Sequence, residues 1–398
     1  MIKYCITKRA IGFTFIIVAV FVFNTGYAQT AASSVRFKKH ILTADFVSED
    51  VAVGDVNRDG KLDILAGTCW FEAPDWKRHE IIPAKILNPG KEYSTSFLDY
   101  SMDVNQDGWT DLVVIGFPGT EALWYENPKG KDGYWKKHAV MKGMGIGNES
   151  PNYVDVNGDG RIDILCADVN AKQMVWLSPP VKKGDTTWTR YPISAANIPG
   201  TDRFSHGLGF DDINKDGRND VIVKSGWWEA PADRKQPDWT FHPADFGDDC
   251  SEIYVMDVNG DGLNDVISAS AHKYGIWWHE QIKDAQGNIS WAQHEINKAF
   301  SETHGVAFTD MNGDGYPDLI TGKRYFAHND TNVDPGSHEL AVLYWFEFTP
   351  GKQPYWIAHQ IDDDSGVGLH LVVQDMNKDK KKDIVVANKK GVFYFERY

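Results

Sequence analysis

The hydrophobic positions of the chain fall into short runs that recur in a fixed order. In the first unit an alternating run at residues 51–53 precedes a polar segment, the β-branched run DILAG, the aromatic run CWFE and the run WKRH. Runs of this length, rich in β-branched and aromatic residues, predict strands. No segment carries apolar residues at helical spacing. The pattern therefore predicts four short strands per unit and an all-β fold.

The polar segment inside each unit is a repeated motif, Asp-x-Asn-x-Asp-Gly-x-x-Asp. Copies begin at Asp55, Asp103, Asp155, Asp212, Asp257 and Asp310, and a seventh copy from Asp375 has Lys380 in place of glycine. Successive copies start 45 to 65 residues apart, a period typical of four-stranded β-propeller blades. The last unit lacks its fourth run, and residues 35–41 match the missing piece. We therefore predict that residues 29–398 form one seven-bladed β-propeller of antiparallel blades, closed by the N-terminal strand.

The first 28 residues differ from the repeats. A basic start with Lys3, Lys8 and Arg9 precedes an apolar run at residues 11–23 and the small residues of a cleavage site ending at Ala28. This order is typical of a secretory signal peptide. The alternative is a membrane anchor, but the run is shorter than the roughly 20 residues that span a bilayer. We expect residues 1–28 to be removed, leaving no membrane anchor and a periplasmic or secreted protein.

The net charge of the chain limits the classes of molecule that it can bind. The net charge is −15, and it becomes −18 without the three basic residues of the first 28. Phosphate backbones need a basic surface, so nucleic acid is excluded as a partner. Only three cysteines follow the signal segment, in different units, so we expect buried or free thiols rather than disulfides.

The motif itself carries the chemistry of a hard cation site. Carboxylate and amide oxygens at positions 1, 3, 5 and 9, with glycine at position 6 for a left-handed turn, can enclose calcium. The repeats resemble the FG-GAP or VCBS-type repeats of integrin-like propellers, a resemblance that implies calcium in the hairpin loops. The alternative is a metal-free hairpin built from Asx turns. In loop seven, Lys380 disfavours the turn and brings a positive charge, so we expect structural calcium in six loops at most. The predicted ligands are Asp55, Asn57, Asp59, Asp63, Asp103, Asn105, Asp107, Asp111, Asp155, Asn157, Asp159, Asp163, Asp212, Asn214, Asp216, Asp220, Asp257, Asn259, Asp261, Asp265, Asp310, Asn312, Asp314 and Asp318.

Histidine separates residues that recur from residues that do not. Six of the 13 histidines recur in the fourth run, which favours a packing role, and His279 takes a slot that is glutamate in most units. The other six are His206, His272, His304, His328, His338 and His370. In a meander blade they belong to the face opposite the motif loops, here called the open face. A functional site is therefore expected on the open face, built by units four to seven.

Lysine, arginine and tyrosine residues join these histidines. Lys224 stands where most other units have small or apolar residues, and an insertion at residues 326–340 forms either a solvated loop or a wall of the site. Such a set suits acid–base chemistry on a polar, anionic or carbonyl-bearing substrate. His206 and His304 are alternatively ligands of zinc or another divalent metal with an open position. The candidate catalytic residues are His206, His304, His272, Lys224, Lys323 and Tyr325, and the candidate substrate-binding residues are Lys273, Arg324, His370, Glu149 and Glu252.

Two segments carry a closer resemblance. HGLGFDDINKDGRNDVIVKSGWWEAP at residues 206–231 and AGTCWFEAPDWKRHEI at residues 66–81 resemble the propeller domain of aldos-2-ulose dehydratase and its bacterial relatives. The resemblance implies metal-assisted removal of water from a keto-sugar, and related propeller lyases imply β-elimination with histidine and tyrosine as base and acid. We therefore expect a lyase or dehydratase acting on a keto-sugar, keto-glycoside or other oxidised saccharide. The alternative is a non-catalytic, calcium-stabilised propeller that binds carbohydrate or protein, and the oligomeric state stays open.

Overall fold

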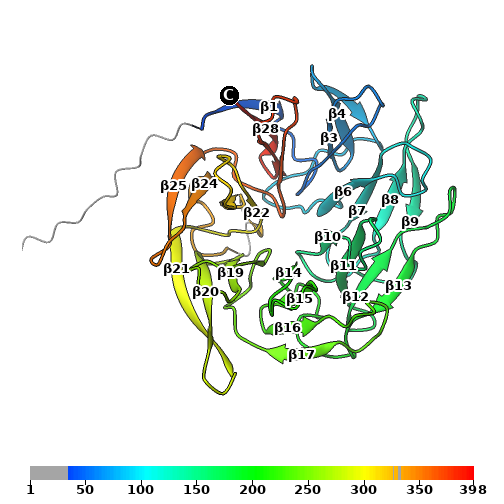
Figure 1. Cartoon of the computed structure of the whole chain (residues 1–398). Helices are drawn as coiled ribbons and strands as arrows, with labels where there is room; N and C mark the ends of the chain where they lie inside the picture. Colours follow the sequence, from blue (N-terminus) through cyan, green and yellow to red (C-terminus); the bar gives the residue numbers. More distant parts are fainter. Residues whose placement is uncertain (1–34, 326, 330–332) are drawn as a thin grey trace, which may run out of the picture. The chain divides into compact units, whose positions relative to one another are not determined.

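The computed structural model describes residues 35–325, 327–329 and 333–398, and the predicted signal peptide lies outside this part of the chain. The described residues form 28 strands in seven four-stranded sheets and contain no helix, so no helical segment there could cross a membrane. The sheets follow one another around a centre as the blades of a propeller (Figure 1). The predicted all-β, seven-bladed architecture is confirmed.

The strands follow the order of the repeated runs. In chain order they are β2 (Ala52–Gly54), β3 (Asp63–Ala66), β4 (Cys69–Glu72) and β5 (Lys77–Glu80) in blade one; β6 (Leu98–Met102), β7 (Asp111–Ile115), β8 (Leu123–Glu126) and β9 (Lys136–Ala139) in blade two; β10 (Asn152–Val154), β11 (Asp163–Asp168), β12 (Gln173–Ser178) and β13 (Thr189–Pro192) in blade three; β14 (Leu208–Asp211), β15 (Asp220–Val223), β16 (Gly226–Glu229) and β17 (Thr240–Pro243) in blade four; β18 (Tyr254–Met256), β19 (Asp265–Ala269), β20 (Tyr274–Lys283) and β21 (Ile289–Ser301) in blade five; β22 (Val306–Thr309), β23 (Asp318–Gly322), β24 (Leu343–Thr349) and β25 (Tyr355–Asp362) in blade six; and β26 (Val372–Gln374), β27 (Asp383–Asn388) and β28 (Gly391–Arg397) in blade seven.

The N-terminal strand completes blade seven. β1 (Phe37–Thr43) pairs antiparallel with β28, with Lys39 opposite Phe395, so the sheet order is β1-β28-β27-β26. The prediction that the N-terminal strand closes the last blade is confirmed. Because the two ends of the ring share one sheet, separating the blades here requires breaking a complete strand ladder.

Each motif is the hairpin loop between the first and second strands of its blade. In blade one, β2 ends at Gly54 and β3 begins at Asp63. First strands of adjacent blades are neighbours, as the parallel bridge between Leu208 and Glu252 shows, so they surround the centre of the ring. The segments before first strands and after second strands therefore lie at the end opposite the motif loops, on the open face.

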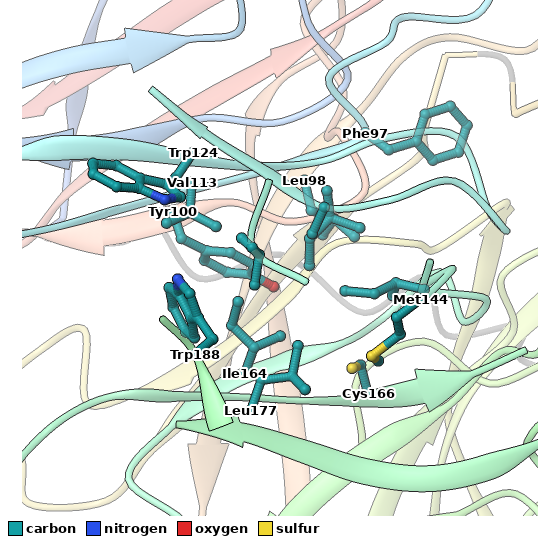
Figure 2. Packing of buried hydrophobic residues seen from close by; sticks show 14 of the residues in the cluster. Phe97, Leu98, Tyr100, Val113, Trp124, Met144, Ile164, Cys166, Leu177 and Trp188 are labelled. Carbon is teal, nitrogen blue, oxygen red and sulfur yellow. The ribbon is translucent and has the colours of Figure 1, made fainter. Parts of the chain in front are cut away.

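The core consists of clusters between adjacent blades, because successive side chains of a strand point to opposite faces of the sheet. In β11, Ile164 and Cys166 pack toward blade two, whereas Leu165 and Ala167 pack toward blade four. Figure 2 shows the first of these clusters, which contains the fully buried Trp124. Cys69, Cys166 and Cys250 are buried free thiols, as expected from the sequence.

The recurrent histidines of the fourth strands have a structural role. Each stacks on an aromatic ring of the third strand and contacts a glutamate there through Nε2; in blade one, His79 lies 4.2 Å from the ring centre of Trp70 and 2.7 Å from Glu72 Oε2. In blade five the glutamate is Glu280, which contacts His294. The sequence comparison matched His279 to this glutamate position, and that match is wrong by one residue. His279 instead is buried against Ser268 Oγ at 3.0 Å.

Candidate functional site

A cavity of about 610 Å³ lies on the open face, and we call it the open-face cavity. Its charged and polar lining comes from blades three to six: Glu149, His206, Asp249, His272, Lys273, Arg324, His328 and Asp334. Aromatic residues form the rest of the wall: Tyr93, Phe97, Phe117 and Phe204. Phe204 is 43% exposed, which leaves one ring face available to a ligand. Saccharide rings commonly need this combination of a flat apolar wall and convergent polar groups.

Three imidazoles converge beside the cavity: His206 and His272 line it, whereas His304 is buried and does not line it. His206 Nε2 and His272 Nε2 lie 3.1 Å apart, and one nitrogen from each of these rings and from His304 falls within a 4.8 Å span. His206 and His304 are buried in front of the first strands β14 and β22, while His272 follows the second strand β19. The structure thus brings together three of the six candidate catalytic residues.

Local contacts determine which ring nitrogens can accept. His206 Nδ1 lies 2.9 Å from the Phe204 carbonyl oxygen, and His272 Nδ1 lies 2.9 Å from Asp334 Oδ2. With the Nδ1 protons donated to these oxygens, the two Nε2 atoms face one another at hydrogen-bond distance, so one of them carries a proton that a bound metal would displace. Neither nitrogen of His304 has a hydrogen-bond partner among the described residues. Burial, followed by the charge of Arg324, holds the pKa of His304 well below its usual range, so this ring is neutral.

Buried ion pairs frame the cluster. Glu149 Oε2 lies 3.5 Å from His206 Nε2, and Arg324, which is 1% exposed, donates to Glu49 at 2.7 Å. Burial raises the pKa of Glu149, but the charge and hydrogen bond of His206, together with the charges of Arg324 and His272, outweigh it and lower the pKa to about 2. Burial lowers the pKa of His206, but Glu149, together with Asp249 and the Phe204 carbonyl, outweighs it and the net shift is upward. The cluster is therefore anionic at Glu149 and able to accept positive charge.

The donor set fits a transition metal. Two ligands of one zinc ion, each at about 2.0–2.1 Å, lie about 3.0–3.4 Å apart, and the His206–His272 separation falls in this range. The buried nitrogens of His304 have no other partner among the described residues, and the oxygens that hold the Nδ1 atoms of His206 and His272 are second-sphere contacts of the kind that such sites use. His206, His272 and His304 would hold the metal, with the cavity leaving an open position.

Several residues predicted for the site lie elsewhere. Lys323 is fully buried, its ammonium contacts the buried carboxylate of Glu302, and it does not line the open-face cavity. Tyr325 does not line the cavity, and the Lys390 ammonium lies 4.6 Å from its ring centre. Lys224 pairs with Asp249 at 2.8 Å and reaches the cavity only through that carboxylate. Lys273, Glu149 and Arg324 do line the cavity as predicted, although Arg324 faces its own carboxylate partners.

His370 and Glu252 line a different cavity, of about 280 Å³, with Tyr100, Tyr153 and Tyr254. Asp50, which lies 3.4 Å from His370 Nδ1, belongs to the same layer. Asp50, Glu252 and His370 each stand five positions before the start of a motif. Glu149, His206 and His304 each stand six positions before one. Adjacent residues of an extended chain face opposite sides, so one position of register separates the two groups. His370 and Glu252 therefore face a different cavity from His206.

Asp334, Asp249 and the aromatic wall are not among the residues predicted from the sequence. His328 is one of the six exceptional histidines and lies in the insertion of blade six with Asp334, whereas His338 from the same segment is exposed. Asp334 lies 2.9 Å from His272 Nδ1 and 2.9 Å from His328 Nδ1. A carboxylate amid two histidines on the longest open-face loop is the signal that could have identified this group. The aromatic wall has no such signal, because its residues come from irregular loops.

The motif loops close on themselves through Asx-type hydrogen bonds. In blade one, Asp55 Oδ2 accepts from the N–H of Gly60, and Asn57 Oδ1 accepts from the N–H of Asp59. At position 9, Asp63 is fully buried and its two oxygens accept the N–H groups of Val56 and Ala73. Calcium binding stays a prediction, and the ninth position contributes to the base of the hairpin in any case.

Loop seven adopts the same turn despite its lysine. Lys380 has φ of 69°, beside 82° for Gly60 and 93° for Gly108 in the equivalent position. Its N–H also donates to Asp375 at 2.9 Å, as Gly60 does to Asp55. Lys380 therefore adopts the turn that it was expected to oppose. The left-handed conformation of this lysine costs about 1–2 kcal/mol.

Comparisons with known proteins agree with this architecture. A model of the FG-GAP-like repeat matches residues 103–166, 155–223 and 257–321, and no curated protein matches the chain. Among solved structures, a chain of the BBS1N–ARL6DN complex soaked with lead is 10% identical, with a TM-score of 0.52, covering 91% of this chain and 95% of that one. An Agrocybe aegerita lectin that recognises non-reducing terminal N-acetylglucosamine is 17% identical, with a TM-score of 0.42 over 83% and 81% of the chains. Rhamnogalacturonan lyase YesW is 11% identical, with a TM-score of 0.42 over 90% and 72%. The chain thus carries FG-GAP-like repeats folded into a seven-bladed β-propeller.

Proposed function

We propose that the open-face cavity is the active site of a carbon–oxygen lyase that acts by β-elimination on a keto-sugar, keto-glycoside or other oxidised saccharide. The observation that carries the proposal is the convergence of His206, His272 and His304, the first two of which line a cavity whose aromatic wall includes the exposed Phe204. A packing role does not explain a buried, neutral His304 without a partner on either nitrogen. Such a group costs stability, so a ligand or substrate contact is its simplest explanation.

The lining residues divide the work of an elimination. A divalent metal held by the three histidines would polarise the carbonyl oxygen and favour enolate formation. Asp249 lines the cavity and is the candidate base for the proton next to the carbonyl. Burial raises the pKa of Asp249, but the hydrogen bond from Lys224 and nearby charges outweigh it, so the carboxylate is ionised and able to take the proton at Oδ.

Other residues would bind and position the substrate. Phe204 presents an exposed ring that a sugar face can cover, with the Arg203 guanidinium 4.7 Å from its centre. Lys273, on the rim, can donate a proton or hydrogen bond to the departing oxygen. The lectin and the lyases among the structural neighbours agree with a saccharide ligand only at the level of the fold.

Enone formation tests this function. The protein is incubated with 3-keto-glycosides and with uronate polysaccharides, and absorbance of the unsaturated product is recorded for wild type and Asp249→Asn. Asp245→Asn is the matched control, because Asp245 is an exposed carboxylate of the same segment that does not line the cavity. The proposal expects product in wild type and control and at least a 100-fold slower rate in Asp249→Asn. Binding of saccharide without product from any substrate would instead support the non-catalytic propeller.

A further inference from the structure

The open-face cavity contains a second cluster of metal-binding groups beside the first. His272, His328 and Asp334 bring three donor atoms within 4.8 Å of one another, and all three residues line the cavity. His272 belongs to both clusters, but through different nitrogens. Its Nε2 faces His206 at 3.1 Å, and its Nδ1 faces Asp334 Oδ2 at 2.9 Å.

Two ring nitrogens lie beside one carboxylate oxygen of Asp334. His272 Nδ1 is hydrogen-bonded to Oδ2 at 2.9 Å, and His328 Nδ1 lies 2.9 Å from the same oxygen, yet this buried His328 nitrogen has no hydrogen bond of acceptable direction among the described residues. The His272 and His328 rings lie nearly parallel, with centres 4.7 Å apart and an interplanar angle of 5°. Two ligands about 2.0–2.2 Å from one ion at near right angles are separated by about the distance between each Nδ1 and Oδ2.

The pairing of charged residues in the cavity also favours a cation beside Asp334. Asp249 is paired with Lys224, Asp248 with Lys273, and Glu49 with Arg324. Asp334 has no lysine or arginine partner in the described part of the chain, and only imidazoles surround it. Its side chain is 16% exposed, so its charge is poorly hydrated. A cation at this point would satisfy the carboxylate and both Nδ1 atoms together.

We propose that a second divalent transition metal binds at His272, His328 and Asp334, so that His272 bridges two ions through its two ring nitrogens. The inference shares His272 with the metal centre of the proposed function and extends that function to a paired site. Bridging requires His272 to lose its remaining ring proton to solvent when the second ion binds. Imidazole nitrogens and one carboxylate favour zinc or copper over calcium or magnesium, so the motif loops and this site select different ions.

The alternative role for Asp334 is to orient His272 by accepting its Nδ1 proton, without any ion. Copper titration separates the two roles, because two Cu²⁺ ions bridged by one imidazolate couple magnetically and lose their electron paramagnetic resonance signal. The full chain is held in excess Ca²⁺ to occupy the motif loops and titrated with Cu²⁺. His328→Ala removes a ligand of the second position only, and Asp334→Asn is a second variant that keeps the shape of the side chain.

We expect the wild-type signal to rise through the first equivalent of Cu²⁺ and to fall through the second. His328→Ala and Asp334→Asn should keep the first signal and show no fall, with affinity for a second ion lowered at least 10-fold. A wild type that binds one ion, or that shows an uncoupled second signal unaffected by His328→Ala, would overturn the inference. Coupled ions in a protein that forms no enone would refute the lyase and leave the paired site intact.

Discussion

His206 and His272 stand 66 positions apart in different blades, yet their Nε2 atoms lie 3.1 Å from each other. Each ring is held at Nδ1 by an oxygen, the Phe204 carbonyl for His206 and the Asp334 carboxylate for His272. The two Nε2 atoms therefore meet at hydrogen-bond distance beside His304, whose ring nitrogens have no partner among the described residues. A packing role would leave His304 satisfied, so this arrangement points to a ligand.

Replacing His304 with leucine should remove function without harming the fold. Both His304 nitrogens are buried without partners, and each such group costs about 1–3 kcal/mol. Leucine has a similar volume, so the thermal unfolding midpoint of His304→Leu should equal or exceed that of wild type while enone formation is lost. Calorimetry and the absorbance assay check the two results.

His279→Leu is the control for this prediction. His279 is buried and bonded to Ser268 Oγ, which also donates to the Phe246 carbonyl, so His279→Leu removes one buried hydrogen bond and should lower stability by about 0.5–1.5 kcal/mol. A His304→Leu protein that is as destabilised as His279→Leu would mean that His304 is a packing residue.

Lys323→Met should destabilise the protein through a broken buried pair. Lys323 and Glu302 are both fully buried, and removing one charge leaves the other uncompensated, at a cost of about 3–5 kcal/mol. Lys224→Met removes a pair whose side chains are more than 40% exposed and should cost about 0–1 kcal/mol. Urea unfolding measures both. Equal stabilities, with loss of enone formation only in Lys323→Met, would support a catalytic role for Lys323.

The contrast between Lys323 and Lys224 shows what could be predicted from the sequence and what could not. The repeated runs determined the blades, the motif hairpins and the closure by β1, because each is a local pattern that recurs seven times. The same repetition identified His206, His272 and His304 as exceptions. Whether an exceptional residue faces a cavity depends on its partners: Lys323 meets Glu302 from the segment before β22, and no pattern in the sequence announces that contact.

Register separates His370 and Glu252 from the histidine cluster. His370 and Glu252 are exceptions to the repeat just as His206 is, but they stand one position nearer the motif and line another cavity. The insertion in blade six was noted from its length, whereas the contact of Asp334 with His272 depends on the path of that loop across the neighbouring blade. Tertiary contacts of irregular segments have no periodicity from which to predict them.

Stability should fall as the solution becomes alkaline. Burial raises the pKa of Glu252 to about 8 and, with the charge of Asp50, that of Asp99 to about 7. The folded protein therefore holds protons that the unfolded chain releases near pH 4. This contribution is full below about pH 4 and is lost as the pH rises through about 7 to 8.

Glu252→Gln removes one of the carboxyl groups that hold a proton in the folded protein and release it in the unfolded chain. For Glu252 the shift corresponds to at most about 5 kcal/mol, and the variant should lose less stability than wild type between about pH 5 and pH 9. Urea unfolding across this range measures the slope. Parallel slopes in wild type and variant would show that Glu252 does not hold the proton.

Calcium should stabilise the propeller through six of its seven motif loops. Adding Ca²⁺ to chelated protein should raise the thermal midpoint, because only the folded loops bring the ligands together. Asp257→Ala should reduce this gain, and Asp375→Ala, in the loop with Lys380, should leave it unchanged. Equal losses in the two variants would show that loop seven binds calcium as well, and no gain in wild type would favour metal-free hairpins.

The central claim is that the histidine cluster on the open face performs β-elimination on an oxidised saccharide. Enone absorbance from a 3-keto-glycoside, recorded for wild type, His304→Leu and the packing control His79→Gln, tests it most directly. The account predicts product from wild type and from His79→Gln, and none above background from a correctly folded His304→Leu. Equal rates in wild type and His304→Leu would contradict the claim, because the chemistry would then lie outside the cluster.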